Sequence, residues 1–186
     1  MVKRKKHPAV FLDRDGVLNI EKGYVTSVKE LEVFDFAPEA VMRLKSLGYK
    51  CICITNQSAV ARGMMTEQEL EIINKKLTNM VPLDAMYYCP HYPPEDKEIP
   101  PYRVNCECRK PNAGMILTAA KEHNINLSKS YFVGDSYSDI LASKKAGTAS
   151  VLIDIKGEYK CSNAAIRPDY RFRSLIEFVE FIEQKK

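Results

Sequence analysis

The segment 9–19 (AVFLDRDGVLN) constrains the fold of this chain more than any other stretch. It begins with four consecutive apolar residues, the pattern of a strand that is buried on both faces of a parallel sheet. Two acids, Asp13 and Asp15, follow at once, and Gly16 then allows the chain to leave the strand sharply. Side chains at the carboxyl end of a parallel strand face the crevice where ligands bind, so the pair predicts a reactive or metal-binding site. One Asp that caps a turn at the strand end, with a second, solvated Asp nearby, would give the same short Asp-x-Asp pattern, and the pattern alone leaves both interpretations open.

The rest of the chain alternates helix-like and strand-like segments, which predicts an α/β fold: a Rossmann-like parallel sheet with helices on both faces. Buried strands are expected over residues 9–12, 49–54, 83–88, 130–133 and 149–153. Amphipathic helices are expected to begin near Pro38, at Thr66, after Pro111 and at Ser174, and a further short helix is expected to end at Gly147. Residues 154–171 are polar and are expected to be irregular.

The length of 186 residues predicts a single domain, 1–186, with a full hydrophobic core. Only about 40 residues separate Asp15 from Thr55, which leaves no room for a large cap domain over the site. The net charge of +4 is modest, and the basic run 3–6 is either an arm for nucleic acid or a solvated terminus, of which we favour the second. No apolar stretch approaches the roughly 18 residues of a membrane helix, and no signal-peptide core follows the basic start. We therefore expect a cytoplasmic monomer that binds neither nucleic acid nor membranes.

Polar side chains follow three of the expected strands at the point where each strand ends. They are Asp13 with Asp15, Thr55 with Asn56, and Asp135 with Asp139. Because such strand ends converge on one edge of a parallel sheet, a single site is predicted there. Asp13 and Asp135 supply oxygen ligands suited to Mg²⁺, which neutralises the repulsion between an attacking carboxylate and a phosphate. Thr55 offers a hydroxyl and Lys110 a positive charge to phosphate oxygens. For Asp139, an alternative is that it orients its neighbours or caps the next helix.

A second metal site is predicted in the long, proline-rich loop 89–110. Its candidate ligands are Cys89, His91, Cys106 and Cys108. Three thiolates and one imidazole form the closed tetrahedral set that is typical of structural Zn²⁺, whereas incidental cysteines beside a surface histidine are the alternative. A closed site leaves no position for a catalytic water, so the zinc is expected to hold the loop in place. Arg109 and Lys110, which follow the last cysteine directly, would then be fixed beside the phosphate site.

Four segments resemble, in order, the motifs of the haloacid-dehalogenase-like phosphotransferases. They are the segment 9–19, Thr55, Lys110 and the segment Gly134-Asp135-x-x-x-Asp139. The resemblance covers residues 9 to about 153 and implies a phosphatase, because superfamily members built for hydrolysis carry the second acid of the first motif.

This resemblance also implies roles for individual residues. Asp13 would be the nucleophile that forms an aspartyl-phosphate, and Asp15 would be the general acid and base. Thr55 and Lys110 would bind the transferred phosphate. Asp13, the backbone carbonyl of Asp15, and Asp135 would bind Mg²⁺.

A longer series of segments is similar to the D-glycero-D-manno-heptose-1,7-bisphosphate 7-phosphatase family. The segments are FLDRDGVLN (11–19), GYV (23–25), TNQS (55–58), ARG (61–63), YYCPH (87–91), CxCRKP (106–111) and VGD (133–135). The similarity implies removal of the C7 phosphate of a heptose bisphosphate, in the biosynthesis of nucleotide-activated heptose for lipopolysaccharide. The substrate contacts that it implies are Glu21, Lys22, Gly23, Tyr24, Thr55, Asn56, Gln57, Ser58, Arg109 and Lys110.

Arg62 and Arg109 are the candidates for binding the second phosphate, although Arg62 could equally be a solvated loop residue. Two residues depart from the pattern of this family. Ala59 stands where Gly is usual and Ser136 where Lys is frequent, and both bear on the preferred sugar or anomer.

Two other functions compete with this interpretation. A histidinol-phosphate phosphatase would carry the same zinc loop, but the segment 61–63 favours the heptose branch. A zinc-stabilised binding module without catalytic activity would use the same fold. The intact residues Asp13, Asp15, Lys110 and Asp135 argue against it.

Overall fold

The computed structural model describes residues 6–94, 98–159 and 167–185. Most of the basic run 3–6 lies outside these ranges, as does part of the loop 89–110. The described residues contain one six-stranded sheet in the order β3-β2-β1-β4-β5-β6, and every neighbouring pair of strands is parallel. The strands are β1 (Ala9–Leu12), β2 (Lys50–Asn56), β3 (Ala85–Cys89), β4 (Tyr131–Gly134), β5 (Ala149–Ile153) and β6 (Tyr170–Phe172).

The order of the strands places a crevice beside β1. From β1 the chain proceeds outward to β2 and β3, then crosses over to β4 on the other side of β1 and proceeds outward again. The chain leaves β1 toward β2 and leaves β4 toward β5, which lie on opposite sides of this pair. The two connections therefore separate at the carboxyl ends of β1 and β4, and a crevice opens between them. The acids that follow β1 therefore stand at the edge of the sheet where a parallel α/β fold binds its ligands.

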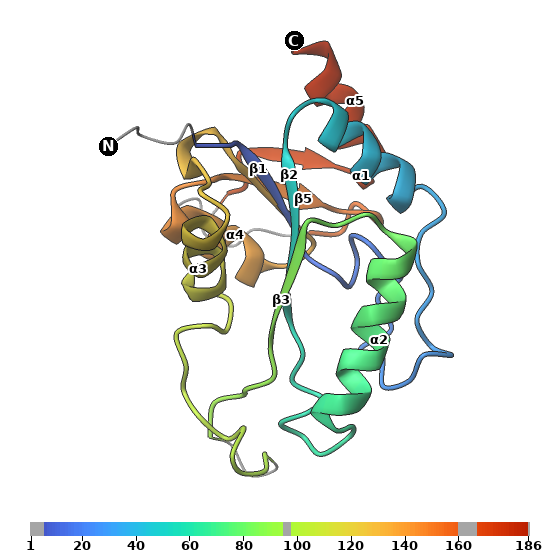
Figure 1. Ribbon diagram of the computed structural model, residues 1–186, viewed down its shortest axis with the longest axis vertical. Helices are drawn as coiled ribbons and strands as arrows, with labels where there is room; N and C mark the ends of the chain where they lie inside the picture. The colour runs from blue at the N-terminus through green and yellow to red at the C-terminus, as the bar shows by residue number, and fades with distance from the viewer. Residues whose placement is uncertain (1–5, 95–97, 160–166, 186) are drawn as a thin grey trace.

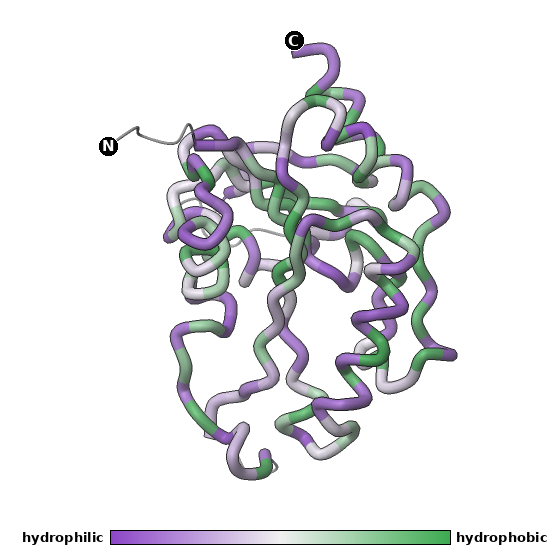
Figure 2. Tube along the Cα trace, in the orientation of Figure 1, coloured by the Kyte–Doolittle hydropathy of each residue, from purple (hydrophilic) through white to green (hydrophobic). Residues whose placement is uncertain are grey.

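Helices cover both faces of the sheet (Figure 1). One face carries α1 (Ala37–Ser46), α2 (Glu67–Met80) and α5 (Leu175–Gln184), and the other carries α3 (Gly114–Glu122) and α4 (Tyr137–Ala146). Strand β1 serves both cores, because Val10 and Leu12 pack in the first cluster while Ala9 and Phe11 pack in the second. All four of these side chains are fully buried. Figure 2 shows the hydrophobic residues concentrated along the central strands.

The predicted α/β class, the parallel sheet and the helices on both faces are confirmed. The capping box expected at Thr66 is present, with the Glu69 carboxylate accepting from the Thr66 backbone and the Thr66 hydroxyl accepting from the Glu69 N–H. The described segment between β1 and β2 holds turns, isolated β-bridges and α1, so no cap domain is inserted there. None of the helices within the described ranges is both long and apolar enough to cross a membrane.

One expectation at the C-terminal end is wrong in detail. Residues 170–172 form strand β6, although the segment 154–171 was expected to be irregular. Strand β6 has only three residues and none of them is buried, so it lacks the apolar run by which the other strands are recognised. It forms because the exposed edge of β5 offers backbone partners, and a sequence pattern does not reveal such a neighbour.

Candidate active site

A pocket of about 180 Å³ opens at the carboxyl ends of β1, β2 and β4. Its lining includes most of the residues predicted from the sequence: Asp13, Asp15, Glu21, Gly23, Tyr24, Thr55, Asn56, Gln57, Ser58, Lys110 and Asp135. Arg14, Val25, Ser136 and Ser138 complete the lining. The predicted residues Lys22, Arg62 and Arg109 do not line it. Thus three strand ends and a distant loop meet at one site, as the sequence predicted.

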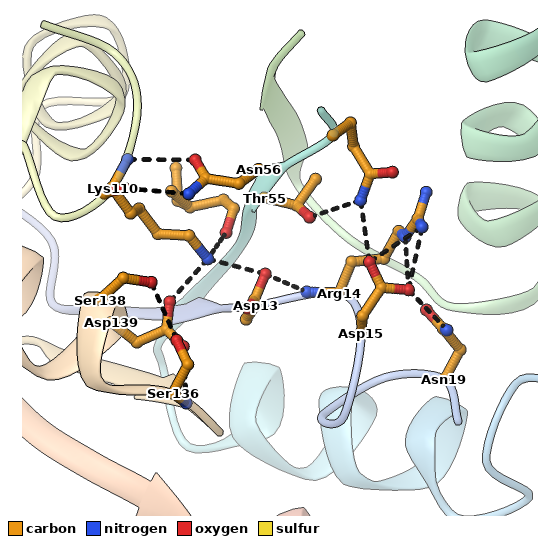
Figure 3. A network of polar contacts seen from close by, with 12 residues as sticks. Asp13, Arg14, Asp15, Asn19, Thr55, Asn56, Lys110, Ser136, Ser138 and Asp139 are labelled. Atoms are coloured by element: carbon orange, nitrogen blue, oxygen red, sulfur yellow. Dashed lines mark hydrogen bonds and ion pairs between the residues drawn. The ribbon is translucent and has the colours of Figure 1, made fainter. Parts of the chain in front are cut away.

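The side chain of Lys110, which lines the pocket, points toward Asp13 and Asp139 (Figure 3). Its Nζ lies 2.8 Å from Asp13 Oδ1 and 2.6 Å from Asp139 Oδ1. It also donates a hydrogen bond of 3.1 Å to the backbone carbonyl of Ile54. Lys110 and Asp139 are buried, so these are ion pairs inside the protein rather than at its surface. The lysine therefore holds the candidate nucleophile in place from a position 97 residues away in the sequence.

The site has more acidic than basic groups, and burial is among the causes that shift their pKa values. Burial raises the pKa of Asp13 to about 7, although the ammonium group of Lys110 acts in the opposite direction. Burial, together with the charges of Asp13 and Asp139, raises the pKa of Asp135 to about 8. For Lys110, burial alone would lower the pKa, but the two carboxylates beside it outweigh burial and hold that pKa above its usual value. Anionic oxygens in excess of cations favour the binding of a metal ion.

The carboxylate of Asp15 is held by three side chains. Arg14 Nη2 donates to both of its oxygens at 2.9 Å, Asn19 Nδ2 donates to one at 2.9 Å, and Gln57 Nε2 donates to the other at 2.8 Å. The Gln57 amide also donates to the Thr55 hydroxyl at 2.9 Å, so it links the ends of β1 and β2. The sequence reasoning did not single out Arg14 or Asn19. For Arg14, the sequence did offer a signal of such a contact, namely its position between Asp13 and Asp15.

Two glycines allow Asp135 and Asp139, which follow β4, to approach the other residues of the site. Gly16 has a φ of +75°, and a Cβ at that position would lie 2.1 Å from Asp135 Oδ2. A Cβ at Gly134 would lie 2.3 Å from the Cβ of Asp139. The Asp135 carboxylate therefore lies directly against the backbone of the first motif, and any side chain at Gly16 would displace it.

Asn56 was predicted to contact the substrate, but its side chain forms hydrogen bonds with the protein backbone instead. Its side-chain amide donates to the Lys110 carbonyl at 3.0 Å and accepts from the Lys110 N–H at 3.1 Å. The amide thus pairs with the backbone of the loop that carries Lys110. Its geometry suits positioning of that lysine, although Asn56 also contributes to the lining of the pocket.

The acids of the pocket are suited to hold a divalent cation. One oxygen from each of Asp13, Asp135 and Asp139 lies within 4.8 Å of the other two. Asp139 Oδ1 is engaged by Lys110, and its Oδ2 accepts from the Ser136 N–H at 3.0 Å and from the Ser136 hydroxyl at 2.5 Å. Asp13 and Asp135 are therefore the better candidates for ligands. Asp139 fulfils the alternative role weighed for it, since it orients Lys110 and caps α4.

The four predicted zinc ligands also come together. The three sulfur atoms of Cys89, Cys106 and Cys108 are 3.0–3.5 Å apart, and His91 Nδ1 lies 3.4 Å from Cys108 Sγ and 3.7 Å from Cys89 Sγ. A tetrahedral zinc with bonds of about 2.3 Å to sulfur separates its ligands by roughly 3.7 Å. The cluster is consistent with a closed structural zinc site.

The three predicted substrate contacts that do not line the pocket are engaged elsewhere. Lys22 forms an exposed ion pair of 2.9 Å with Glu32. The guanidinium groups of Arg62 and Arg109 both lie over the ring of Tyr92. Arg109 nevertheless directly precedes Lys110, which lines the pocket.

Comparison with known proteins identifies relatives of nearly equal length. The D-glycero-beta-D-manno-heptose-1,7-bisphosphate 7-phosphatase of Haemophilus ducreyi is 37% identical over 180 residues, which cover 94% of this chain and 97% of the relative. The protein of that name from Escherichia coli K12 is 34% identical over 187 residues, which cover 98% of this chain and 97% of the relative. A family model described as HAD-hydrolase-like matches residues 107–178.

Solved structures agree with these relatives. The crystal structure of D,D-heptose 1,7-bisphosphate phosphatase from B. bronchiseptica, complexed with magnesium and phosphate, has a TM-score of 0.78 and 27% identity, and covers 96% of this chain and 99% of that one. A putative HAD-like phosphatase from Mesorhizobium loti has a TM-score of 0.82 and 26% identity, and covers 99% and 90% respectively. Since relatives of this identity extend over almost the whole sequence, the chain belongs to the D-glycero-β-D-manno-heptose-1,7-bisphosphate 7-phosphatase family of HAD-like hydrolases.

Proposed function

We propose that this protein removes the C7 phosphate of D-glycero-D-manno-heptose 1,7-bisphosphate through an aspartyl-phosphate intermediate on Asp13. The observation that carries the proposal is the buried Asp13 carboxylate at the end of β1, held by Lys110 at 2.8 Å and facing a polar pocket. The substrate is taken from the relatives that cover nearly the whole chain, whose names specify the β anomer. A single domain and a monomer are part of the same proposal.

The chemistry proceeds in two displacements on phosphorus. The Asp13 carboxylate forms a bond to the phosphorus while the bond to the sugar oxygen breaks, and Asp15 gives its proton to that oxygen. Asp15 then takes a proton from water, which attacks the aspartyl-phosphate and releases inorganic phosphate. The hydrogen bonds from Arg14, Asn19 and Gln57 keep the Asp15 carboxylate in one orientation for both steps.

Asp13, Asp135 and the backbone carbonyl of Asp15 would hold Mg²⁺ in this pocket. When bound, the ion supplies positive charge that lets an anionic carboxylate approach an anionic phosphate. The excess of acids over cations at the site supports this assignment, as does the magnesium in the related crystal structure from B. bronchiseptica. Lys110 supplies a second positive charge to the phosphate.

We assign the Cys89, His91, Cys106 and Cys108 cluster to a structural zinc ion. Four protein ligands would complete its coordination, so the zinc would hold the loop rather than activate water. The loop that it holds carries Lys110 into the pocket. The proposal thus connects the zinc to catalysis only through the position of that lysine.

The C7 phosphate is the group expected to react, because an exocyclic arm can reach Asp13 at the bottom of the open pocket. The C1 phosphate, attached to the ring itself, would remain outside near Arg62 and Arg109. Contacts with that remote phosphate would accelerate the reaction by positioning the C7 group.

The test is Mg²⁺-dependent release of phosphate from a panel of substrates. The panel contains both anomers of heptose 1,7-bisphosphate, heptose 7-phosphate and histidinol phosphate. We expect the β-bisphosphate to give the highest kcat/KM and phosphorus NMR to show the anomeric phosphate retained in the product. A preference for histidinol phosphate, or loss of the anomeric phosphate first, would overturn the proposal.

A further inference from the structure

Two arginine side chains from loops that are far apart in the sequence lie over the ring of Tyr92. The guanidinium carbon of Arg62 lies 4.3 Å from the centroid of the Tyr92 ring, and that of Arg109 lies 4.5 Å from it. Both distances are well within the range of about 6 Å in which an aromatic face attracts a cation. We call Arg62, Tyr92, Glu98 and Arg109 the Tyr92 cluster.

The backbone on either side of the ring is fixed. The Tyr92 N–H donates to the Tyr102 carbonyl at 3.1 Å, and the Tyr92 carbonyl accepts from the Val104 N–H at 3.0 Å. Arg109 Nη1 donates to the carbonyl of His91 at 3.1 Å, so the arginine is bound to the residue that precedes the ring. The backbone that carries the ring is therefore held in place, and two long side chains lie over the ring.

The charges of the cluster do not cancel. Arg62 lies 3.5 Å from a carboxylate oxygen of Glu98, whose side chain is fully buried. Within residues 6–94, 98–159 and 167–185, no carboxylate lies within ion-pair distance of Arg109. The two guanidinium groups and one carboxylate leave a net positive charge that can receive an anion.

Both arginines of the cluster are close in sequence to residues that line the pocket. Arg109 directly precedes Lys110, and Arg62 follows Ser58 at a reach of at most about 14 Å of extended chain. Lys110 and Ser58 both line the pocket. A ligand with one phosphate at Asp13 and a second anionic group at its other end can therefore meet the cluster.

We propose that Tyr92 is a positioning residue that determines specificity for a bisphosphate. Its ring holds Arg62 and Arg109 in place at the edge of the pocket, where they receive the second phosphate of the substrate. An arginine that is already ordered loses less rotamer entropy on binding, so the ring strengthens binding of the bisphosphate and not of a monophosphate. The inference rests on the proposed function, because that function supplies the second phosphate.

Kinetics of three variants test the proposal on heptose 1,7-bisphosphate and heptose 7-phosphate. Tyr92→Leu keeps apolar bulk but removes the aromatic face, and we expect it to raise KM for the bisphosphate about tenfold with a much smaller change in kcat. Tyr92→Phe keeps the face and removes only the hydroxyl, so it should retain a KM close to that of the wild type. Tyr92→Trp should do the same. Equal losses on both substrates, or a loss in Tyr92→Phe as large as in Tyr92→Leu, would overturn the role of the ring.

Fluorescence provides a measurement that does not depend on the Leu variant folding. The chain has no tryptophan, so Tyr92→Trp places a single reporter in the cluster. In an Asp13→Asn background, which prevents turnover, we expect its emission to change on titration with the bisphosphate and not with the monophosphate. An equal response to both, or none to the bisphosphate, would contradict the proposal. Wild-type turnover of the bisphosphate tests the proposed function separately.

Discussion

Replacement of Asp135 by Asn is expected to stabilise the metal-free protein while it removes a proposed ligand for magnesium. Burial and the nearby charges of Asp13 and Asp139 raise the pKa of Asp135 from 3.8 to about 8. Between these two values, the folded protein retains a proton that the unfolded chain has already released. The free energy of unfolding therefore falls as the pH rises from about 4 to about 8, and above that range the whole penalty applies.

The structure sets the size of this effect. At about 1.36 kcal/mol per pKa unit, a shift of roughly four units gives a ceiling of about 5 kcal/mol. Asp135 is partly exposed, and water screens its charge, so we expect about 2 kcal/mol to be measurable. Asn has the same shape as Asp, which matters because the side chain lies against the backbone of Gly16.

The assay is urea unfolding of the wild type and of Asp135→Asn at about pH 4.5 and pH 8.5, in buffer without magnesium and without a chelator that would remove zinc. We expect the variant to be more stable by about 2 kcal/mol at the higher pH and by much less at the lower one. Added Mg²⁺ should stabilise the wild type according to its dissociation constant and leave the variant almost unchanged. A gain that is the same at both values of pH, or a variant less stable than the wild type at pH 8.5, would refute the reasoning.

Three further substitutions test the other assignments. Asp13→Asn should abolish phosphate release and leave the unfolding transition in place, because the amide cannot attack phosphorus; near-normal turnover would show that the nucleophile is another group. Cys106→Ser should lower the zinc content from about one ion per chain and lower the Tm, as measured by metal analysis and thermal unfolding; a zinc-free protein of equal stability and activity would contradict the structural role. Arg109→Ala should reduce kcat/KM for the bisphosphate far more than for heptose 7-phosphate, and equal effects on both would argue against an anion at the Tyr92 cluster.

The local pattern of the chain determined most of the secondary structure and the positions of the acids. The apolar runs before Asp13, Thr55 and Asp135 predicted three neighbouring strands, because a strand buried on both faces needs an unbroken apolar segment. The pairs of candidate metal ligands around 89–91 and 106–108 predicted one closed cluster, because their types and spacing suit few other structures. These features are short in sequence, so each can be recognised without knowledge of the rest of the chain.

The tertiary structure decided which side chains meet within the site. Lys110 pairs with Asp13 and Asp139, Gln57 with Asp15, and Asn56 with the backbone of Lys110. These contacts depend on how the loop after β3 packs against the end of β2, and periodicity carries no information about packing between distant segments. For the same reason the sequence did not show that Arg62 and Arg109 would lie over Tyr92 instead of lining the pocket.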